Sequence, residues 1–300
     1  MIEVITTTPE EIEQQKQLFD IYCGILFNNM DFAPGKKEEI HYHFHCPEYK
    51  TLIEKYHIDR IAGEGSAYKR ACRLLHWMSP KLKHQADYDN HVGANALALL
   101  DYSLDKLENG INCKNKSIVL TECCLALGIY ARRVYIFPYS PYDGDNHVTT
   151  EIFDPDMDKW IMLDPTTDGF HVDAQGRPLS LVELRDRCAR YEYASFTYPK
   201  DSSEAGEALW SRHSWTNAYI AKNLFRFVVD GENGFNMADK RPLHIIPQGY
   251  NLKESQLQYV EYMLKIRPEF REWALSYREK LCTSPEPKRC DVSTLTAKPE

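Results

Sequence analysis

The sequence predicts an α+β fold in which a layer of helices packs on an antiparallel sheet. Two observations lead to this prediction. Apolar residues recur at helical spacing in several segments of the first 130 residues, and residues 131–163 then carry three short β-rich runs. Turn residues separate these runs by short connections, which favours antiparallel pairing. The chain has 300 residues, enough for one large domain or two small ones.

The predicted helices carry recognisable start and stop signals. Thr8 precedes Pro9, and Glu11 follows three residues after Thr8, which is a capping-box arrangement at the start of a helix. An apolar face then continues to Leu26. Further helices are expected over about residues 47–56, 65–78 and 94–107, and from Cys113 to Gly128.

Three strands follow these helices. The first is predicted over Ala131–Phe137, and Val148–Phe153 and Trp160–Leu163 form a hairpin around the turn at residues 154–158. Arg132 and Arg133 are adjacent on the first strand. Because successive side chains point to opposite faces, we expect only one of them to face the core and the other to be solvated.

The rest of the chain has a different pattern. Ser180–Glu183 is a second capping box that begins a helix to about Arg190, and two strands are predicted over 223–229 and 243–246. Two helices follow, from about Leu252 and after Pro268. The predicted organisation is an N-terminal helical extension (1–60), a core (61–190), a C-terminal α/β extension packed on the core (191–282) and a disordered polar tail (283–300).

Composition excludes several functional classes. The formal net charge is −8, so the chain is not expected to bind nucleic acid or an anionic membrane. No apolar run approaches the roughly 20 residues that a spanning helix needs, and the N-terminus lacks a signal-peptide pattern, so we expect a cytoplasmic protein. The nine cysteines are irregularly spaced and odd in number, which favours reduced thiols.

Three residues in the central segment suggest nucleophilic catalysis. Cys113 follows a glycine-containing turn and opens a helix, where unpaired N–H groups and the helix dipole favour a thiolate. His147 begins a strand and Asp164 ends the next, so the hairpin should make them cross-strand neighbours. His147 can then act as the base of the Cys113 thiol, with Asp164 fixing its tautomer.

These segments resemble the transglutaminase-like superfamily. The resemblance lies in Gly110-Ile-Asn-Cys113, in Gly128-Ile-Tyr-Ala-Arg-Arg-Val134, in the histidine strand after Asn146, and in Trp160-Ile-Met-Leu-Asp164-Pro-Thr. It covers roughly residues 65–190. It implies a papain-like core with Cys113, His147 and Asp164 as catalytic triad, a thioester intermediate, a peptide or protein amide as substrate, and no cofactor.

The sequence also departs from the family pattern. Val148 follows the histidine, where relatives often have an aromatic residue, and no upstream oxyanion side chain is evident. The backbone N–H of Cys113 is one candidate donor, with Asn112 or Gln85 as a second. No zinc-binding Cys-x-x-Cys pairs and no calcium loop are visible, so hydrolysis is favoured over cross-linking. The alternative is a non-catalytic binding or scaffolding module on the same fold.

Other candidate residues have competing interpretations. Tyr139 and Tyr142, near the histidine loop, and Trp160 are candidates for a substrate groove, although ordinary packing is the favoured reading of all three. His41, His43 and His45 alternate and would share one face of a strand, as in a metal site. A surface strand is favoured, because no distal ligand pair is visible. The sequence leaves the substrate and the oligomeric state open.

Overall fold

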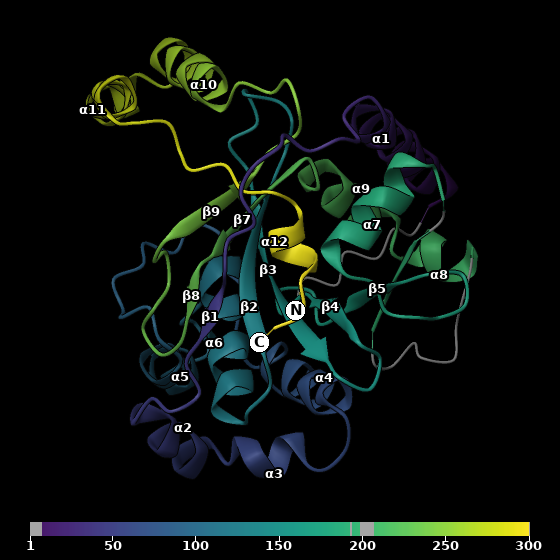
Figure 1. The fold of residues 1–300 in the computed structure, drawn as a ribbon, viewed down its shortest axis with the longest axis vertical. Coiled ribbons are helices and arrows are strands. Elements are labelled where there is room, and N and C mark those ends of the chain that lie inside the picture. Colours follow the sequence, from purple (N-terminus) through teal and green to yellow (C-terminus); the bar gives the residue numbers. More distant parts are fainter. Residues whose placement is uncertain (1–7, 193, 199–206, 300) are drawn as a thin grey trace.

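A five-stranded antiparallel sheet runs through the middle of the molecule, in the order β4-β3-β2-β7-β9 (Figure 1). The computed structural model describes residues 8–192, 194–198 and 207–299, so parts of the predicted extensions (1–7, 193 and 199–206) and residue 300 of the tail lie outside the described residues. The strands are β2 (Ala131–Phe137), β3 (His147–Asp154), β4 (Lys159–Leu163), β7 (Arg226–Asp230) and β9 (Pro242–Ile245). Helices pack on this sheet, which confirms the predicted α+β fold.

One face of the sheet is covered by the helices of the first half of the chain. The central helix, α6 (Cys113–Ala126), lies against β2 and β3 and is buried along nearly its whole length. Around it lie α2 (Glu48–Tyr56), α3 (Ile58–Ala62), α4 (Ala67–Met78) and α5 (Ala96–Asp105). Because α6 is enclosed, its first residue is held in a fixed position at the end of the sheet.

The other face is covered by helices from the start and from the second half of the chain (Figure 1). These are α1 (Pro9–Phe27), α7 (Leu181–Ala189), α8 (Glu207–Arg212), α9 (Ser214–Asn223) and α12 (Ser293–Thr296). Two pairs of short strands complete the fold: β5 (Phe170–Val172) with β6 (Ser195–Thr197), and β1 (His41–Tyr42) with β8 (Glu232–Asn233). A second apolar cluster, with Leu26, Met162 and Phe227 among its members, fills this side.

Coverage of both faces corrects the expectation for Arg132 and Arg133. Both side chains are buried, with 1% and 0% of their surface exposed. The Arg132 guanidinium donates to Glu151 at 2.7 Å and lies 3.7 Å from the centre of the Trp160 ring. On the opposite face, Arg133 Nε donates to Asp230 at 2.9 Å. Each arginine therefore has its own buried carboxylate partner.

The C-terminal tail is ordered, which corrects the expectation of disorder. β-Bridges join His244 to Arg289 and Lys36 to Cys290, and α12 follows directly. The Trp160 indole N–H donates to the carbonyl of Ala297 at 2.8 Å. Short polar segments are ordered here because the sheet offers them hydrogen-bond partners, a tertiary effect that composition does not reveal.

The predicted boundary at residue 190 falls inside one sheet. β7 and β9 follow that boundary, yet β7 pairs directly with β2, from Val134↔Val229 to Phe137↔Arg226. The core and the C-terminal extension therefore share a continuous set of backbone hydrogen bonds.

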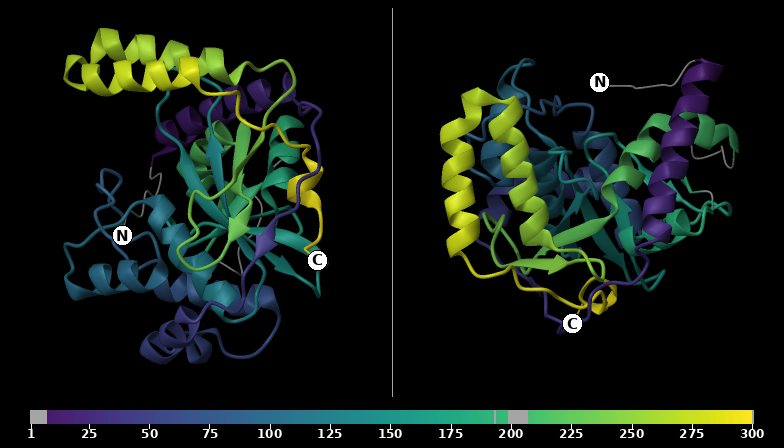
Figure 2. Two further views of the ribbon diagram at one scale, coloured as in Figure 1. Left: turned by 60° about the vertical axis from the view of Figure 1, so that its left-hand side comes forward. Right: turned by 90° about the horizontal axis from the view of Figure 1, so that it is seen from above.

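A helical hairpin stands off the sheet at one end of the molecule (Figure 2). It consists of α10 (Leu252–Ile266) and α11 (Arg271–Thr283), joined by a 3₁₀ turn at Pro268–Phe270. Tyr262 of α10 meets the ring of Tyr142 with centroids 5.3 Å apart, which connects the hairpin to the loop 138–146. Among the described helices, none is both long and apolar enough to cross a bilayer.

Candidate active site

Cys113 is the first residue of α6 and lies half-buried at the helix N-terminus. Asn112 is the N-cap, because its Oδ1 accepts from the backbone N–H of Asn115 at 3.1 Å. Its amide also donates to Asn90 Oδ1 at 3.2 Å, and Asn115 donates to the same oxygen at 2.8 Å. These bonds fix the turn that presents the Cys113 sulfur at the end of the sheet.

His147 is the first residue of β3 and has only 3% of its surface exposed. Its Nε2 lies 3.0 Å from Oδ2 of Asp164. The Cys113 side chain lies close enough to the same ring to contribute to the raised pKa of His147. Because Asp164 occupies Nε2, Nδ1 is the nitrogen left for the sulfur, and the ring lies between the thiol and the carboxylate.

Asp164 follows the last residue of β4, and its position refines the expected hairpin geometry. The ladder between β3 and β4 ends at Thr150↔Leu163. Continuing this register places Asp164 opposite Thr149, so Asp164 and His147 are diagonal neighbours, a separation that side chains of their length can span. Both carboxylate oxygens have donors: the Thr166 N–H at 2.9 Å and the Thr167 hydroxyl at 2.8 Å.

The His147–Asp164 pair is charged in the folded protein. Burial lowers the pKa of His147, but the charge of Asp164 and the hydrogen bonds to Asp164 and Cys113 outweigh it and raise that pKa to about 10. Burial raises the pKa of Asp164, and the charge and hydrogen bond of His147 oppose it, so that its pKa falls to about 2. The result is an imidazolium held beside the sulfur.

A cavity of about 510 Å³ opens beside these three residues and is lined by Cys113 and His147. Its walls come from segments far apart in sequence: His84 from the segment before α5, Asn146 from the loop before β3, Thr167 after β4, and Trp215 from α9. The cavity has the size of a small-ligand or side-chain pocket, and the candidate nucleophile and base both face it.

Helix α9 supplies an aromatic wall to this cavity. Tyr219 packs against His147 edge to face, with ring centroids 5.5 Å apart. Trp215, one turn earlier, stacks on Tyr219 with centroids 5.1 Å apart and planes inclined by 4°. Residue spacing within a helix accounts for this pair, since positions i and i+4 lie on the same face. The sequence analysis missed α9 and both residues.

Two further titratable side chains surround the nucleophile. Lys116, one turn into α6, is 1% exposed, and its Nζ donates to the carbonyl of Ser79 at 3.1 Å. Burial lowers the pKa of Lys116 to about 8, against the attraction of Asp164, Asp168 and Cys113. Burial, Lys116 and His147 together lower the pKa of His84, so the ring that lines the cavity is neutral at pH 7.

The oxyanion candidates differ in position. Asn112 lines the cavity, but its side chain caps α6 and binds Asn90. Gln85 does not line it: its side chain packs against Gly110, where an added Cβ would lie 2.6 Å from Gln85 Cβ. The parallel bridge between His84 and Ile111 turns His84 toward the cavity, and the adjacent residue Gln85 therefore points elsewhere.

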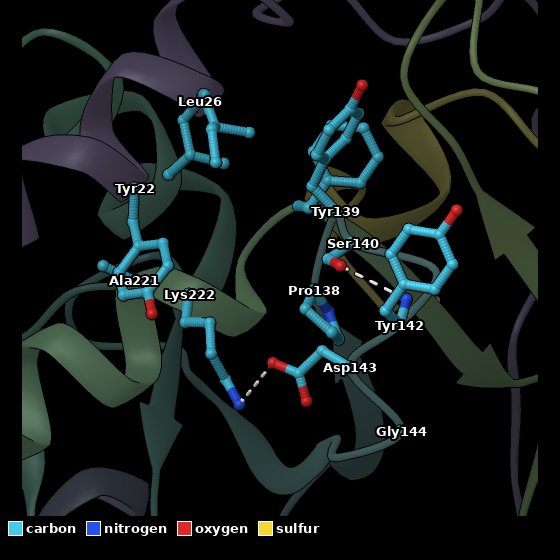
Figure 3. A pocket seen from close by; sticks show the side chains of 12 residues that line it. Tyr22, Leu26, Pro138, Tyr139, Ser140, Tyr142, Asp143, Gly144, Ala221 and Lys222 are labelled. Atoms are coloured by element: carbon cyan, nitrogen blue, oxygen red, sulfur yellow. Dashed lines mark hydrogen bonds and ion pairs between the residues drawn. The ribbon is translucent and has the colours of Figure 1, made fainter. Parts of the chain in front are cut away.

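The structure also places the three groove candidates away from the Cys113 cavity. Trp160 is 4% exposed and packs on Arg132, in agreement with the packing interpretation. Tyr139 and Tyr142 line a separate cavity of about 370 Å³ between α1, α9 and the loop 138–146 (Figure 3). This correction follows from the loop's course, because its first half turns toward α1 and only Gly144–Asn146 reach the Cys113 cavity.

Two of the alternating histidines, His41 and His43, share one carboxylate as a hydrogen-bond partner. His41 Nδ1 and His43 Nε2 lie 2.9 Å and 2.8 Å from the two carboxylate oxygens of Glu232, across the β1–β8 pair. In the described part of the chain, no group of three or more His, Cys, Asp or Glu side chains is arranged to hold a metal ion.

The Asp154 carboxylate accepts the N–H groups of Asp156 and Met157, as in an ordinary turn.

Comparison with known proteins agrees with the resemblance seen in the sequence. Residues 55–165 match the sequence model of the Transglutaminase-like superfamily, and this stretch contains Cys113, His147 and Asp164. The chain therefore contains a transglutaminase-like superfamily domain.

A structure described as that of a candidate cysteine protease from Cytophaga hutchinsonii aligns with a TM-score of 0.31 and 15% identity, over 53% of this chain and 49% of that one. The chain thus spans about half the length of that protein. None of the curated proteins matches.

Proposed function

We propose that this protein is a cysteine enzyme that transfers the acyl group of a peptide or protein amide through a thioester on Cys113. The observation that carries the proposal is the position of the His147 ring, which lines the same cavity as Cys113 and lies 3.0 Å from Asp164. A thiol, an imidazole and a carboxylate in this order form a nucleophile, a base and a group that orients the base.

The first half of the reaction breaks the amide. The sulfur of Cys113, which lies beside His147 at the N-terminus of α6, attacks the carbonyl carbon and forms a C–S bond, and its proton is held by His147. The C–N bond then breaks, and the leaving amine takes the proton from His147. Asp164 keeps the ring oriented during this transfer, since its own oxygens are held by Thr166 and Thr167.

The second half releases the acyl group. Water attacks the thioester carbon, His147 accepts the proton of the water, and the C–S bond breaks to give a carboxylic acid and the free sulfur. We favour water over an amine as acceptor because the sequence contains no calcium-binding loop of the kind used by cross-linking relatives.

The negative oxygen of the tetrahedral intermediate requires donors. We assign one to the backbone N–H of Cys113 and the second to the neutral ring of His84, which lines the same cavity. This assignment replaces Gln85, whose side chain packs on Gly110.

The test combines alkylation of the cysteines with cleavage of peptide amides. Below pH 7, limiting iodoacetamide should modify Cys113 faster than Cys282, although Cys282 is the exposed cysteine in α11. Peptide amides should be cleaved by the wild-type chain and by Cys282→Ala, and not by Cys113→Ala. A Cys113→Ala variant with full amide-hydrolysing activity would overturn the proposal. Alkylation that follows exposure alone would instead favour the non-catalytic binding module.

A further inference from the structure

Trp215 differs from the other tryptophans near the sheet. Trp160 and Trp210 are 4% and 2% exposed, and both belong to the packed interior. Trp215 is half-buried and lines the Cys113 cavity. Its indole N–H has no hydrogen-bond partner among the residues that the structure describes. A large aromatic ring with a free donor on a cavity wall is the usual form of a binding surface.

The Trp215 ring is held in a defined position relative to the reacting groups. It stacks on Tyr219 at 4° between planes, and Tyr219 packs on His147. Tyr219 is itself fixed, because its hydroxyl donates to Asp145 at 3.4 Å and Lys222 Nζ lies 5.1 Å from its ring centre. The stack therefore connects the wall of the cavity to the proposed base through two rigid contacts.

The charged side chains of the cavity already have partners. Lys114 forms an ion pair with Asp239, which also accepts the Tyr135 hydroxyl at 2.6 Å. Asp145 is paired with Lys222 at 3.2 Å. Since these charges are compensated within the protein, the wall around Trp215 discriminates by apolar contact and stacking rather than by the charge of a ligand.

We propose that Trp215, supported by Tyr219, forms a specificity subsite for an aromatic side chain next to the scissile amide of the substrate. This inference rests on the proposed function, and it specifies the substrate class: a peptide amide with Phe, Tyr or Trp beside the bond that Cys113 attacks. Both residues belong to α9, outside the family-matched segment 55–165, so the subsite is a property of the C-terminal part of this chain.

The test compares two fluorogenic peptide amides that differ only in Phe or Ala beside the scissile bond. The wild-type chain should prefer the Phe peptide in kcat/KM. Trp215→Ala should raise KM for the Phe peptide about tenfold or more and bring the ratio of kcat/KM for the Phe peptide over the Ala peptide close to one. Trp215→Phe, which keeps a stacked ring, should retain most of the preference. A preference that survives Trp215→Ala overturns the subsite.

Trp273→Ala is the matched control. Trp273 also stacks on a tyrosine of its own helix, Tyr277, with planes inclined by 15°, but it lies on the α10–α11 hairpin and does not line the cavity. This variant should keep the wild-type preference. An equal loss in Trp273→Ala and Trp215→Ala would assign the effect to general destabilisation and overturn the subsite.

A binding measurement separates failure of the subsite from failure of the chemistry. Calorimetry with the Cys113→Ala variant should show tighter binding of the Phe peptide than of the Ala peptide, and adding Trp215→Ala should remove the difference. If the wild-type chain cleaves neither peptide but this binding difference is found, the proposed hydrolysis fails and the subsite stands. Equal binding of both peptides to Cys113→Ala overturns the subsite.

Discussion

The ring of Tyr219 meets the ring of His147 nearly at right angles, at 75°, with the centroids 5.5 Å apart. His147 lies within the family-matched segment 55–165, whereas Tyr219 comes from α9, more than 50 residues later (219 − 165 = 54). The orientation of the proposed base therefore depends on a helix outside the matched domain. Replacement of Tyr219 is the direct measure of this dependence.

Tyr219→Ala should lower kcat for a small peptide amide about tenfold, because the imidazole loses the contact that restricts its rotation. Tyr219→Phe keeps the ring and should stay within about threefold of the wild type. Steady-state kinetics with the Ala peptide checks this, since that substrate does not use the aromatic subsite. Equal losses in the two variants would show that the hydroxyl, not the ring, is the important group.

Asp164→Asn should lower the free energy of unfolding by an amount that depends on pH. The pKa of His147 is raised from 6.5 to about 10 and that of Asp164 is lowered from 3.8 to about 2. The stabilisation from His147 is therefore complete below pH 6.5 and is lost as the pH rises through about 10. The stabilisation from Asp164 is complete above pH 3.8 and is lost as the pH falls through about 2.

The free energy of unfolding should therefore be higher for the wild-type chain than for Asp164→Asn. The difference should be largest, about 3 kcal/mol, between about pH 4 and 6.5. Urea denaturation at pH 5 and pH 9 measures this difference. A difference that grows toward pH 9 would contradict a charged pair. The same variant should lose at least about 100-fold in kcat.

His84→Ala should lower kcat about 100-fold with KM changed less than threefold, because an oxyanion donor acts mainly in the transition state. His84→Gln returns a side-chain N–H and should recover part of the loss. Gln85→Ala is the control, since Gln85 packs against Gly110 and does not line the cavity. A larger loss in Gln85→Ala than in His84→Ala would reverse the assignment.

Lys116→Met should raise the free energy of unfolding at pH 7 by about 1–3 kcal/mol, because it removes a buried charge from the core. The pKa of Lys116 falls from 10.5 to about 8 on folding, so the unfolded chain holds the proton more tightly. The free energy of unfolding of the wild-type chain should therefore increase as the pH rises from 8 to 10.5. Over the same range, the difference in stability between Lys116→Met and the wild type should shrink. A variant that is less stable at pH 7 would show that the bond to Ser79 outweighs desolvation.

Local signals were sufficient to predict the segments that carry the proposed triad. The asparagine before Cys113 and the glycine at 128 bracket α6, and turn residues at 154–158 separate β3 from β4. These features depend on short-range geometry, and for that reason they can be read from one sequence. The resemblance to the transglutaminase-like superfamily rests on the same segments and is confirmed.

Features that depend on distant contacts were not predictable. Helix α9 is buried on nearly all sides, with Asn217, Ala218 and Ile220 each at most 2% exposed, so it shows no apolar stripe. The burial of both Arg132 and Arg133 depends on Glu151 and on Asp230, the second nearly 100 residues away. The Gln85 side chain points away from the Cys113 cavity because the Gln85 backbone N–H donates to the carbonyl of Ile111. Each of these outcomes was decided by a partner distant in sequence.

The pairing of β2 with β7, and the packing of α9 on His147, have a consequence during synthesis on the ribosome. When Asp164 has just been made, the ribosome must still add 55 residues to reach Tyr219 (219 − 164), and more to reach β7. At roughly 5–20 residues per second, the nascent chain carries all three residues of the proposed triad for several seconds before the last wall of the cavity exists. The cavity around the proposed nucleophile, Cys113, is thus completed late, after α9 has emerged.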